Sequence, residues 1–192
     1  MNHLAHLALA GDAYLVGSFL GDYIKGRLNG AHPEFIERGI RLHRAIDAYT
    51  DSHPVIRRSA NRFDPAFRRY AGIMTDVFYD YMLANSWHDY YDTPLSEFSR
   101  YTLAMLLEHE AHLTTKAAGT AKRMQQHNAL AHYGKDSFLD GAFQNLSARL
   151  SRINPLADAG AQCRQHQDAL ARDFVAFYPE LIAFCENWKQ AG

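Results

Sequence analysis

Imidazole and carboxylate side chains recur at helical spacing in one short segment of this chain. His43, Asp47 and Asp51 follow one another at intervals of four residues. On a helix each residue advances by 100°, so these three side chains share a face with the apolar residues Ile36 and Ile40. Burying an unpaired carboxylate is costly, so acids on such a face need a cation, a strong hydrogen-bond donor or a water-filled cleft.

Two other segments place acids on apolar helical faces. Asp76 and Asp80 stand four residues apart and share a face with Leu83, while Asp22 shares a face with Phe19. Three helices therefore offer inward-facing acids. Small residues that would let another helix approach closely lie in the Asp22 segment: Gly17, Gly21 and Gly26.

Aspartates combined with one or two histidines are typical of a site for Mn²⁺, Mg²⁺ or Fe²⁺. Hard carboxylate oxygens dominate such a set, and the only cysteines, Cys163 and Cys185, have no metal-type spacing. The ion would orient phosphate oxygens and acidify a water molecule that attacks phosphorus. Arg44 and Lys25 could share the charge of the transition state.

The residues alone leave a plainer interpretation open, in which these acids form ordinary ion pairs. Asp47 and Asp51 could pair with Arg44 or Arg58. In the same way, Asp76 and Asp80 could pair with Arg69. His53, which precedes Pro54, could simply cap the turn.

The elements that would position these side chains are helices. Apolar residues recur at intervals of three and four almost throughout, and no run alternates like a strand. With 47 % hydrophobic residues, residues 1–192 are expected to form one all-α domain, a helical bundle. The punctuating Gly, Pro and capping residues predict helices over about 13–28, 33–51, 54–63, 65–86, 96–115, 120–133, 136–151, 157–176 and 179–189.

Composition restricts the location and the partners of the protein. The net charge of −1 argues against a generic nucleic-acid binder. No apolar run approaches the ~20 residues that span a bilayer, and the first residues carry His3 and His6 rather than a cationic region, so we expect neither membrane insertion nor export. Two cysteines suit a reducing compartment. The sequence therefore predicts a cytoplasmic protein without a nucleic-acid or membrane partner, and it leaves the oligomeric state open.

Charge is unevenly distributed along the chain. Residues 38–69 carry eight arginines against three acids. Such a segment is either a solvated helix surface or a docking surface for an acidic partner. The arginines are Arg38, Arg41, Arg44, Arg57, Arg58, Arg62, Arg68 and Arg69, and the acids are Asp47, Asp51 and Asp64.

Several separated blocks together resemble a known family. The strongest is His43-Arg44-Ala45-Ile46-Asp47-Ala48-Tyr49-Thr50-Asp51, and the others are Asn2-His3-Leu4-Ala5-His6, Gly17-Ser18-Phe19-Leu20-Gly21-Asp22, Asp76-Val77-Phe78-Tyr79-Asp80 and Phe177-Tyr178-Pro179. On these blocks the chain resembles the acyl carrier protein phosphodiesterases. The resemblance runs nearly from end to end.

This resemblance implies a fold and a reaction. It implies a helical fold distantly related to the HD-type metal phosphohydrolases, with Mn²⁺ or a similar ion (Mg²⁺, Fe²⁺ or Co²⁺) as cofactor. The implied reaction removes 4′-phosphopantetheine from the serine of holo-acyl carrier protein and leaves the apo form. The chain departs from the HD pattern because His43 and Asp47 are four residues apart rather than adjacent. The basic segment matches the strongly acidic carrier protein.

The resemblance and the residues together assign roles to individual side chains. The principal metal ligands are predicted to be Asp22, His43, Asp47 and Asp76, with outer or alternative positions for His6, Asp51 and Asp80. Arg44 and Lys25 are expected to hold the phosphate, and His53 to protonate the departing serine oxygen. The expected carrier-protein dock consists of Arg57, Arg58 and Arg62.

Two other functions fit the same residues. The first is an HD-like hydrolase that acts on a nucleotide or another small phosphodiester with the same metal centre. The second is a non-catalytic helical module that binds an acidic protein through its arginines.

Overall fold

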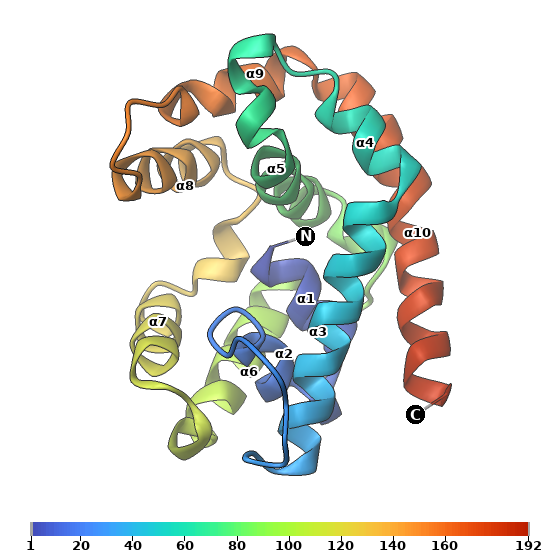
Figure 1. Cartoon of the computed structure of the whole chain (residues 1–192), viewed down its shortest axis with the longest axis vertical. Helices are drawn as coiled ribbons and strands as arrows, with labels where there is room; N and C mark the ends of the chain where they lie inside the picture. The colour runs from blue at the N-terminus through green and yellow to red at the C-terminus, as the bar shows by residue number, and fades with distance from the viewer. Residues whose placement is uncertain (1, 192) are drawn as a thin grey trace.

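The computed structural model describes residues 2–191, and helices are the only regular structure within that range (Figure 1). The α-helices are α1 (His3–Ala10), α2 (Leu15–Leu20), α3 (Glu34–Ser52), α4 (Pro54–Ala60), α5 (Ala71–Asn85), α6 (Leu95–Glu108), α7 (Thr115–Gln126), α8 (Asp136–Arg149), α9 (Ala159–Gln165) and α10 (Gln167–Ala191). Short 3-10 turns lie between some of them: η1 (Asp12–Tyr14), η2 (Pro65–Tyr70), η3 (Trp87–Asp89), η4 (Glu110–His112), η5 (Ala129–His132) and η6 (Leu156–Asp158). The prediction of an all-α fold is confirmed.

Two clusters of buried side chains hold the helices together. The first joins α1, α2, α3, α6 and α10, and the second joins η2, α5, α8 and α9. Figure 1 shows α3 and α10 side by side along one edge, with α1 and α2 inside the molecule and α8 and α9 beyond α5. Helix α5 links the two clusters, because Tyr79 and Leu83 belong to the first and Met74 and Phe78 to the second. None of the helices within residues 2–191 is both long enough and apolar enough to cross a membrane.

Glycines bring α2 and α3 into backbone contact. A Cβ atom added to Gly17 would lie 2.7 Å from the Cα atom of Gly39, far inside the normal separation of two carbon atoms. The prediction that Gly17 lets another helix approach is therefore confirmed. Gly26 serves a different purpose from the one predicted, because its φ of +84° and its open surroundings place it in a turn.

The beginning of the chain differs from the prediction. The predicted helix over 13–28 is wrong, because α2 ends at Leu20 and a loop containing Gly26 and Gly30, both at positive φ, follows it. Helix α1 was not predicted. It begins after Asn2, whose side-chain oxygen accepts a hydrogen bond from the His3 backbone N–H and so caps the helix.

The other predicted helices agree with the structure to different extents. The predicted helix over 33–51 is confirmed as α3, but the helix over 65–86 is split into η2 and α5. The predicted break at Pro179 is also wrong, because α10 continues through this proline. The buried side chains of Phe177, Tyr178 and Leu181 flank Pro179 on α10, and their packing holds the helix together despite the lost backbone donor.

Candidate metal centre

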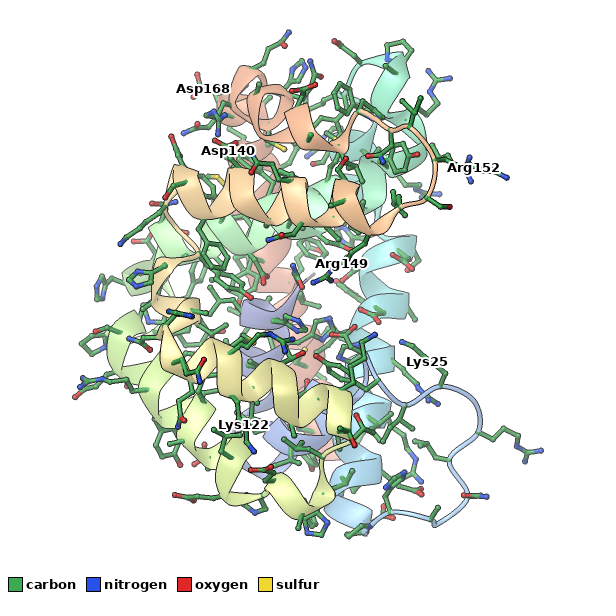
Figure 2. All side chains as sticks on the ribbon, turned by 90° about the vertical axis from the view of Figure 1, so that its left-hand side faces the viewer. Lys25, Lys122, Asp140, Arg149, Arg152 and Asp168 are labelled. Carbon is green, nitrogen blue, oxygen red and sulfur yellow. The ribbon has the colours of Figure 1, made fainter. Side chains whose placement is uncertain are left out.

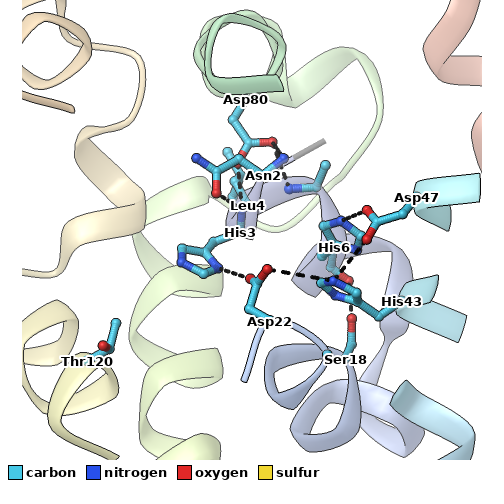
Figure 3. A network of polar contacts seen from close by, with 12 residues as sticks. Asn2, His3, Leu4, His6, Ser18, Asp22, His43, Asp47, Asp80 and Thr120 are labelled. Atoms are coloured by element: carbon cyan, nitrogen blue, oxygen red, sulfur yellow. Dashed lines mark hydrogen bonds and ion pairs between the residues drawn. The ribbon is translucent and has the colours of Figure 1, made fainter. Parts of the chain in front are cut away.

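Two imidazoles and one carboxylate meet where α1 contacts α3. His6 Nε2 lies 3.1 Å from one oxygen of Asp47, and His43 Nε2 lies 3.3 Å from the other (Figure 3). The two imidazole rings stack with their centroids 3.9 Å apart. One ligand atom from each of the three residues lies within 4.8 Å of the other two. This spacing allows His6, His43 and Asp47, called here the His–Asp cluster, to bind one ion.

The cluster continues through a second carboxylate. Asp22 Oδ1 lies 3.8 Å from His43 Nε2, and Asp22 Oδ2 lies 3.3 Å from His3 Nδ1. Figure 3 shows the resulting chain of contacts from His3 through Asp22, His43 and Asp47 to His6. Helix α1 supplies both ends of this network, because His3 and His6 are three residues apart on one helical face.

Burial gives the site two unlike sides. The side chains of His6 and His43 are each 4 % exposed, whereas those of Asp47 and Asp22 are 47 % and 45 % exposed. The imidazoles therefore belong to the core, and the carboxylates face the solvent from which a substrate would arrive.

The His43 ring occupies space that a side chain at Gly21 would fill. A Cβ atom on Gly21 would lie 2.7 Å from His43 Cβ and closer still to the ring. Gly21 was expected to let another helix approach, and this expectation is confirmed. The glycine is required here by the position of the imidazole.

The protonation states suit metal binding. Burial lowers the pKa of His6 to about 4, so this imidazole is neutral at neutral pH. Burial alone would raise the pKa of Asp47, but hydrogen bonds from His43 and His6 hold it well below its usual range. Burial alone would also raise the pKa of Asp22, but the hydrogen bond from His3 lowers it to about 2. A neutral imidazole and ionised carboxylates are the forms that ligate a cation.

The donor set therefore fits a divalent ion. Two imidazole nitrogens with carboxylate oxygens suit Mn²⁺ or Fe²⁺ better than a thiolate-selecting metal. One feature departs from the usual arrangement, in which the second ring nitrogen of a ligating histidine has a partner. Nδ1 of His6 and Nδ1 of His43 are buried without a hydrogen-bond partner among residues 2–191.

Two further predicted ligands, Asp51 and Asp76, lie outside the group of three residues whose ligand atoms could hold one ion. Asp51 lies on the last turn of α3 and is exposed, and Asp76 on α5 is half-buried. Partial burial raises the pKa of Asp51, and the negative charges of Asp76 and Asp47 raise it further. Asp51 thus lies close enough to Asp76 and to Asp47 for their negative charges to act on it.

Asp80 acts at the beginning of α1. Its buried carboxylate accepts backbone N–H groups from Leu4 at 2.7 Å, Ala5 at 3.2 Å and Asn2 at 3.3 Å (Figure 3). These donors are among those that a helix leaves unsatisfied at its start. Burial raises the pKa of Asp80 to about 6, although the Leu4 and Ala5 donors act in the opposite direction. Asp80 therefore anchors the helix that carries His6.

The two predicted phosphate-binding cations hold the loop that follows α2. Arg44 Nη2 donates to the Ile24 carbonyl at 3.0 Å, and Lys25 Nζ donates to the Gly21 carbonyl at 3.2 Å. Both contacts fix backbone on either side of Asp22. These cations therefore position the Asp22 segment.

The predicted proton donor, His53, faces α10. Its Nδ1 accepts the Val55 N–H at 3.3 Å and caps α4, while its Nε2 lies 3.3 Å from Glu180 Oε2. The ring also packs against Tyr49 and Phe177. Both ring nitrogens are therefore engaged by groups outside the His–Asp cluster.

The predicted docking arginines lie on α4 and just beyond it. Arg58 and Arg62 each contact the buried carboxylate of Asp173 on α10 at 2.8 Å, and Ser59 donates to it as well. Burial alone would raise the pKa of Asp173, but the hydrogen bonds from Arg62, Arg58 and Ser59 hold it below its usual range. Two of the three arginines thus anchor α4, whereas Arg57 is exposed.

The role of His3 was missed by sequence reasoning. The signal was present, because Asn2 is a good capping residue and His3 and His6 follow at helical spacing. The first helix predicted from the sequence began at residue 13, so His3 and His6 were not placed on a common helical face.

The fold and the site together define an all-α protein with a His–Asp cluster of metal-binding type. Residues 1–181 match the family model described as acyl carrier protein phosphodiesterase. Curated relatives with that name share 32 % identity in Enterobacter sp. (strain 638) and 30 % in Klebsiella pneumoniae subsp. pneumoniae, in each case over 97 % of this chain and 98 % of the relative. The Escherichia coli relative is 30 % identical over 95 % of this chain and 96 % of its own.

No solved structure matches this chain. The chain belongs to the acyl carrier protein phosphodiesterase family, and the resemblance inferred from its motifs is confirmed.

Proposed function

We propose that this chain hydrolyses the phosphodiester between 4′-phosphopantetheine and the serine of holo-acyl carrier protein. Family membership makes the chain an acyl carrier protein phosphodiesterase, an enzyme that acts on a phosphodiester bond. We place the active site at His6, His43 and Asp47 because their ligand atoms lie close enough together to hold one ion. Family membership favours this reaction over hydrolysis of a nucleotide and over a binding module without activity.

The His–Asp cluster is the proposed seat of a divalent ion. Mn²⁺ is the expected ion, and Mg²⁺, Fe²⁺ and Co²⁺ are alternatives to be tested. His6 thereby becomes a direct ligand beside His43 and Asp47, while Asp22 and Asp76 complete or surround the ion, with Asp51 farther out. Such an ion, when bound, polarises the phosphate and acidifies a water molecule. We also propose that the fold is distantly related to that of the HD-type metal phosphohydrolases.

The residues of the chain must orient water and receive the leaving group. Water adds across the bond: its oxygen joins phosphorus, the bond from phosphorus to the serine oxygen breaks, and that oxygen takes a proton. Asp22 and Asp47 are ionised and half-exposed, so they can accept hydrogen bonds from the attacking water. Arg44 and Lys25 are proposed to balance charge on the phosphate while they hold the loop around Asp22.

His53 remains the proposed proton donor to the serine oxygen. To reach that oxygen it must leave Glu180, since its Nε2 lies 3.3 Å from that carboxylate. His3 is a histidine already inside the polar network of the cluster, through its 3.3 Å contact with Asp22. Substitution of His53 tests whether His53, rather than His3, donates the proton.

The carrier protein is proposed to dock over α4. The side chain of Arg57 is exposed there, and Arg58 and Arg62 contribute the positive charge that remains after they pair with Asp173.

A cytoplasmic location, without nucleic acid or membrane as partner, is proposed together with a single domain over residues 1–192. The two cysteines are free and buried, which is compatible with a reducing compartment.

The proposed reaction is tested by the mass of the carrier protein. Holo-acyl carrier protein is incubated with the purified chain in Mn²⁺, in Mg²⁺ or in EDTA, and intact-protein mass spectrometry follows the carrier. We expect conversion to the apo mass in Mn²⁺ and none in EDTA. An unchanged carrier mass with every ion would overturn the proposed function.

A further inference from the structure

A cleft adjoins the solvent-facing side of the His–Asp cluster. It has a volume of about 720 Å³ and lies between α7, α8 and the start of α1. His3 and Asp22, which belong to the polar network of the cluster, line it. Basic side chains from two other helices line the same cleft: Lys116 and Arg123 from α7, and Arg149 from the end of α8. Figure 2 shows this face of the molecule, with Arg149 between the two helices.

Arg123 and Arg149 line the same cleft from two different helices, and Arg123 Nη2 donates to the Thr120 hydroxyl at 3.1 Å within it. Tyr23 is the neighbour of Asp22 in the chain and also lines the cleft. Among residues 2–191, neither arginine forms an ion pair with a carboxylate. Two positively charged side chains thus lie beside the His–Asp cluster and can bind an anion.

The cleft leads into an apolar pocket. A hollow of about 260 Å³ shares His3, Tyr133, Phe138 and Arg149 with the cleft. Beside the shared polar residues Asn2 and Asn145, four apolar side chains line this hollow and not the cleft: Val77, Leu139, Ala142 and Leu146. The residues Asp22, Lys116 and Arg123 line only the cleft, and the four apolar side chains line only the hollow, so charge is concentrated toward one end of the combined space. This arrangement suits an elongated ligand with one charged end.

This polarity matches the 4′-phosphopantetheine group, which carries a phosphate at one end and a neutral chain with a dimethyl carbon and two amides beyond it. We infer that the cleft binds the 4′-phosphopantetheine arm, with Arg123 and Arg149 on the phosphate and the apolar pocket around the neutral chain. Guanidinium groups form strong charge-assisted hydrogen bonds with phosphate oxygens. This inference rests on the proposed function and adds to it the part of the substrate that the cleft recognises.

The basic segment on α4 is less suited to the same task. Arg58 and Arg62 are already paired with Asp173, which their guanidinium groups contact at 2.8 Å. Arg123 and Arg149 retain their charge for a ligand and lie beside the His–Asp cluster. The structure therefore separates a surface for the carrier protein on α4 from a site for its prosthetic arm between α7 and α8.

The test measures binding of free 4′-phosphopantetheine by isothermal titration calorimetry, with pantetheine as the probe that lacks the phosphate. Arg123→Ala and Arg149→Ala should each weaken 4′-phosphopantetheine binding roughly tenfold, the effect of one charge-assisted hydrogen bond at an accessible site. Binding of pantetheine should not change. Holo-acyl carrier protein should show a raised KM in both variants, whereas the affinity for apo-acyl carrier protein should stay as in the wild type.

Two neighbouring cations serve as matched controls (Figure 2). Lys122 directly precedes Arg123 on α7, but it does not line the cleft, and its Nζ lies 2.6 Å from Glu110 Oε1. Arg152 lies beyond the end of α8 and lines a separate hollow. Lys122→Ala and Arg152→Ala remove the same charge and should leave 4′-phosphopantetheine binding unchanged.

Three results would overturn the inference: no binding of 4′-phosphopantetheine to the wild type, variants that bind it as the controls do, or an equal loss of affinity for apo and holo carrier. The last result would assign these arginines to protein docking. Failure of the proposed function is a separate outcome, because it appears as an unchanged carrier mass with the wild-type chain.

Discussion

Replacing Gly21 with alanine should disturb the His–Asp cluster through a single added methyl group. The backbone of Gly21 has φ −54° and ψ −31°, a conformation that alanine adopts without strain. The added Cβ, however, would lie 2.7 Å from His43 Cβ, where carbon atoms normally pack at about 3.5–4.0 Å. To restore an ordinary contact, the His43 side chain or α3 must shift by roughly 1 Å.

The shift has two consequences of different size. Overpacking of this kind costs about 1–3 kcal/mol, and for a chain of this length each kcal/mol lowers Tm by roughly 2–4 °C. A displacement of about 1 Å in a catalytic group can lower the rate about 100-fold. Gly21→Ala should therefore remain folded, bind Mn²⁺ more weakly and lose most of its activity on holo-acyl carrier protein.

The assay combines thermal unfolding, Mn²⁺ titration and hydrolysis of the carrier. Gly72→Ala provides the matched control, because Gly72 lies in α5 and an added Cβ would meet nothing within 4 Å. The control should be neutral or slightly more stable, by about 0.5–1 kcal/mol, with unchanged activity. If Gly21→Ala bound Mn²⁺ and hydrolysed the carrier as the control does, the proposed role of His43 would be refuted.

Three other substitutions test separate parts of the structure. The pKa of Asp80 is raised to about 6 from 3.8, so the native state retains a proton that the unfolded state loses, and Asp80 removes stability as pH rises from about 4 to about 6. Because the lowered pKa of His6 adds stability over the same range, the contribution of Asp80 is read from the difference between the wild type and Asp80→Asn: in urea unfolding, the stability of the wild type relative to Asp80→Asn should fall from about pH 4 to about pH 6. Arg57→Glu should raise KM for the carrier with a smaller effect on a minimal phosphodiester, and equal losses would exclude docking. For His53→Gln, a lower kcat at unchanged KM supports a proton donor, whereas a change in stability alone contradicts that role.

The sequence predicted the helical fold class because apolar periodicity is a local signal. It located α3 accurately for the same reason, with Pro33 before this helix and Pro54 after it. It placed a break at Pro179 because a proline disfavours a helix locally. Packing of Phe177 and Leu181 in the core overrides that preference, and no local pattern reports such packing.

For the site, residue types were predictable and their partnerships were not. His43, Asp47 and Asp22 were selected from faces and spacing, and the structure brings them together. The closeness of His6 depends on where α1 contacts α3, a tertiary arrangement that spacing within one helix does not determine. Asp80 has the same spacing from Asp76 as Asp47 has from His43, yet its partners are backbone groups of α1.

The balance of charge around the cluster explains why two sources of positive charge are needed. Asp22, Asp47, Asp51 and Asp76 form an acidic group, and the neighbouring His6 is neutral at neutral pH. Two like charges 4 Å apart repel by about 4 kcal/mol near a protein surface, so these carboxylates alone would repel a phosphodiester anion. The proposed divalent ion, held by His6 and His43, would offset the charge of these carboxylates from the buried side. In the inferred complex Arg123 and Arg149 would attract the phosphate from the cleft side, and binding of the ion should therefore precede productive binding of the substrate.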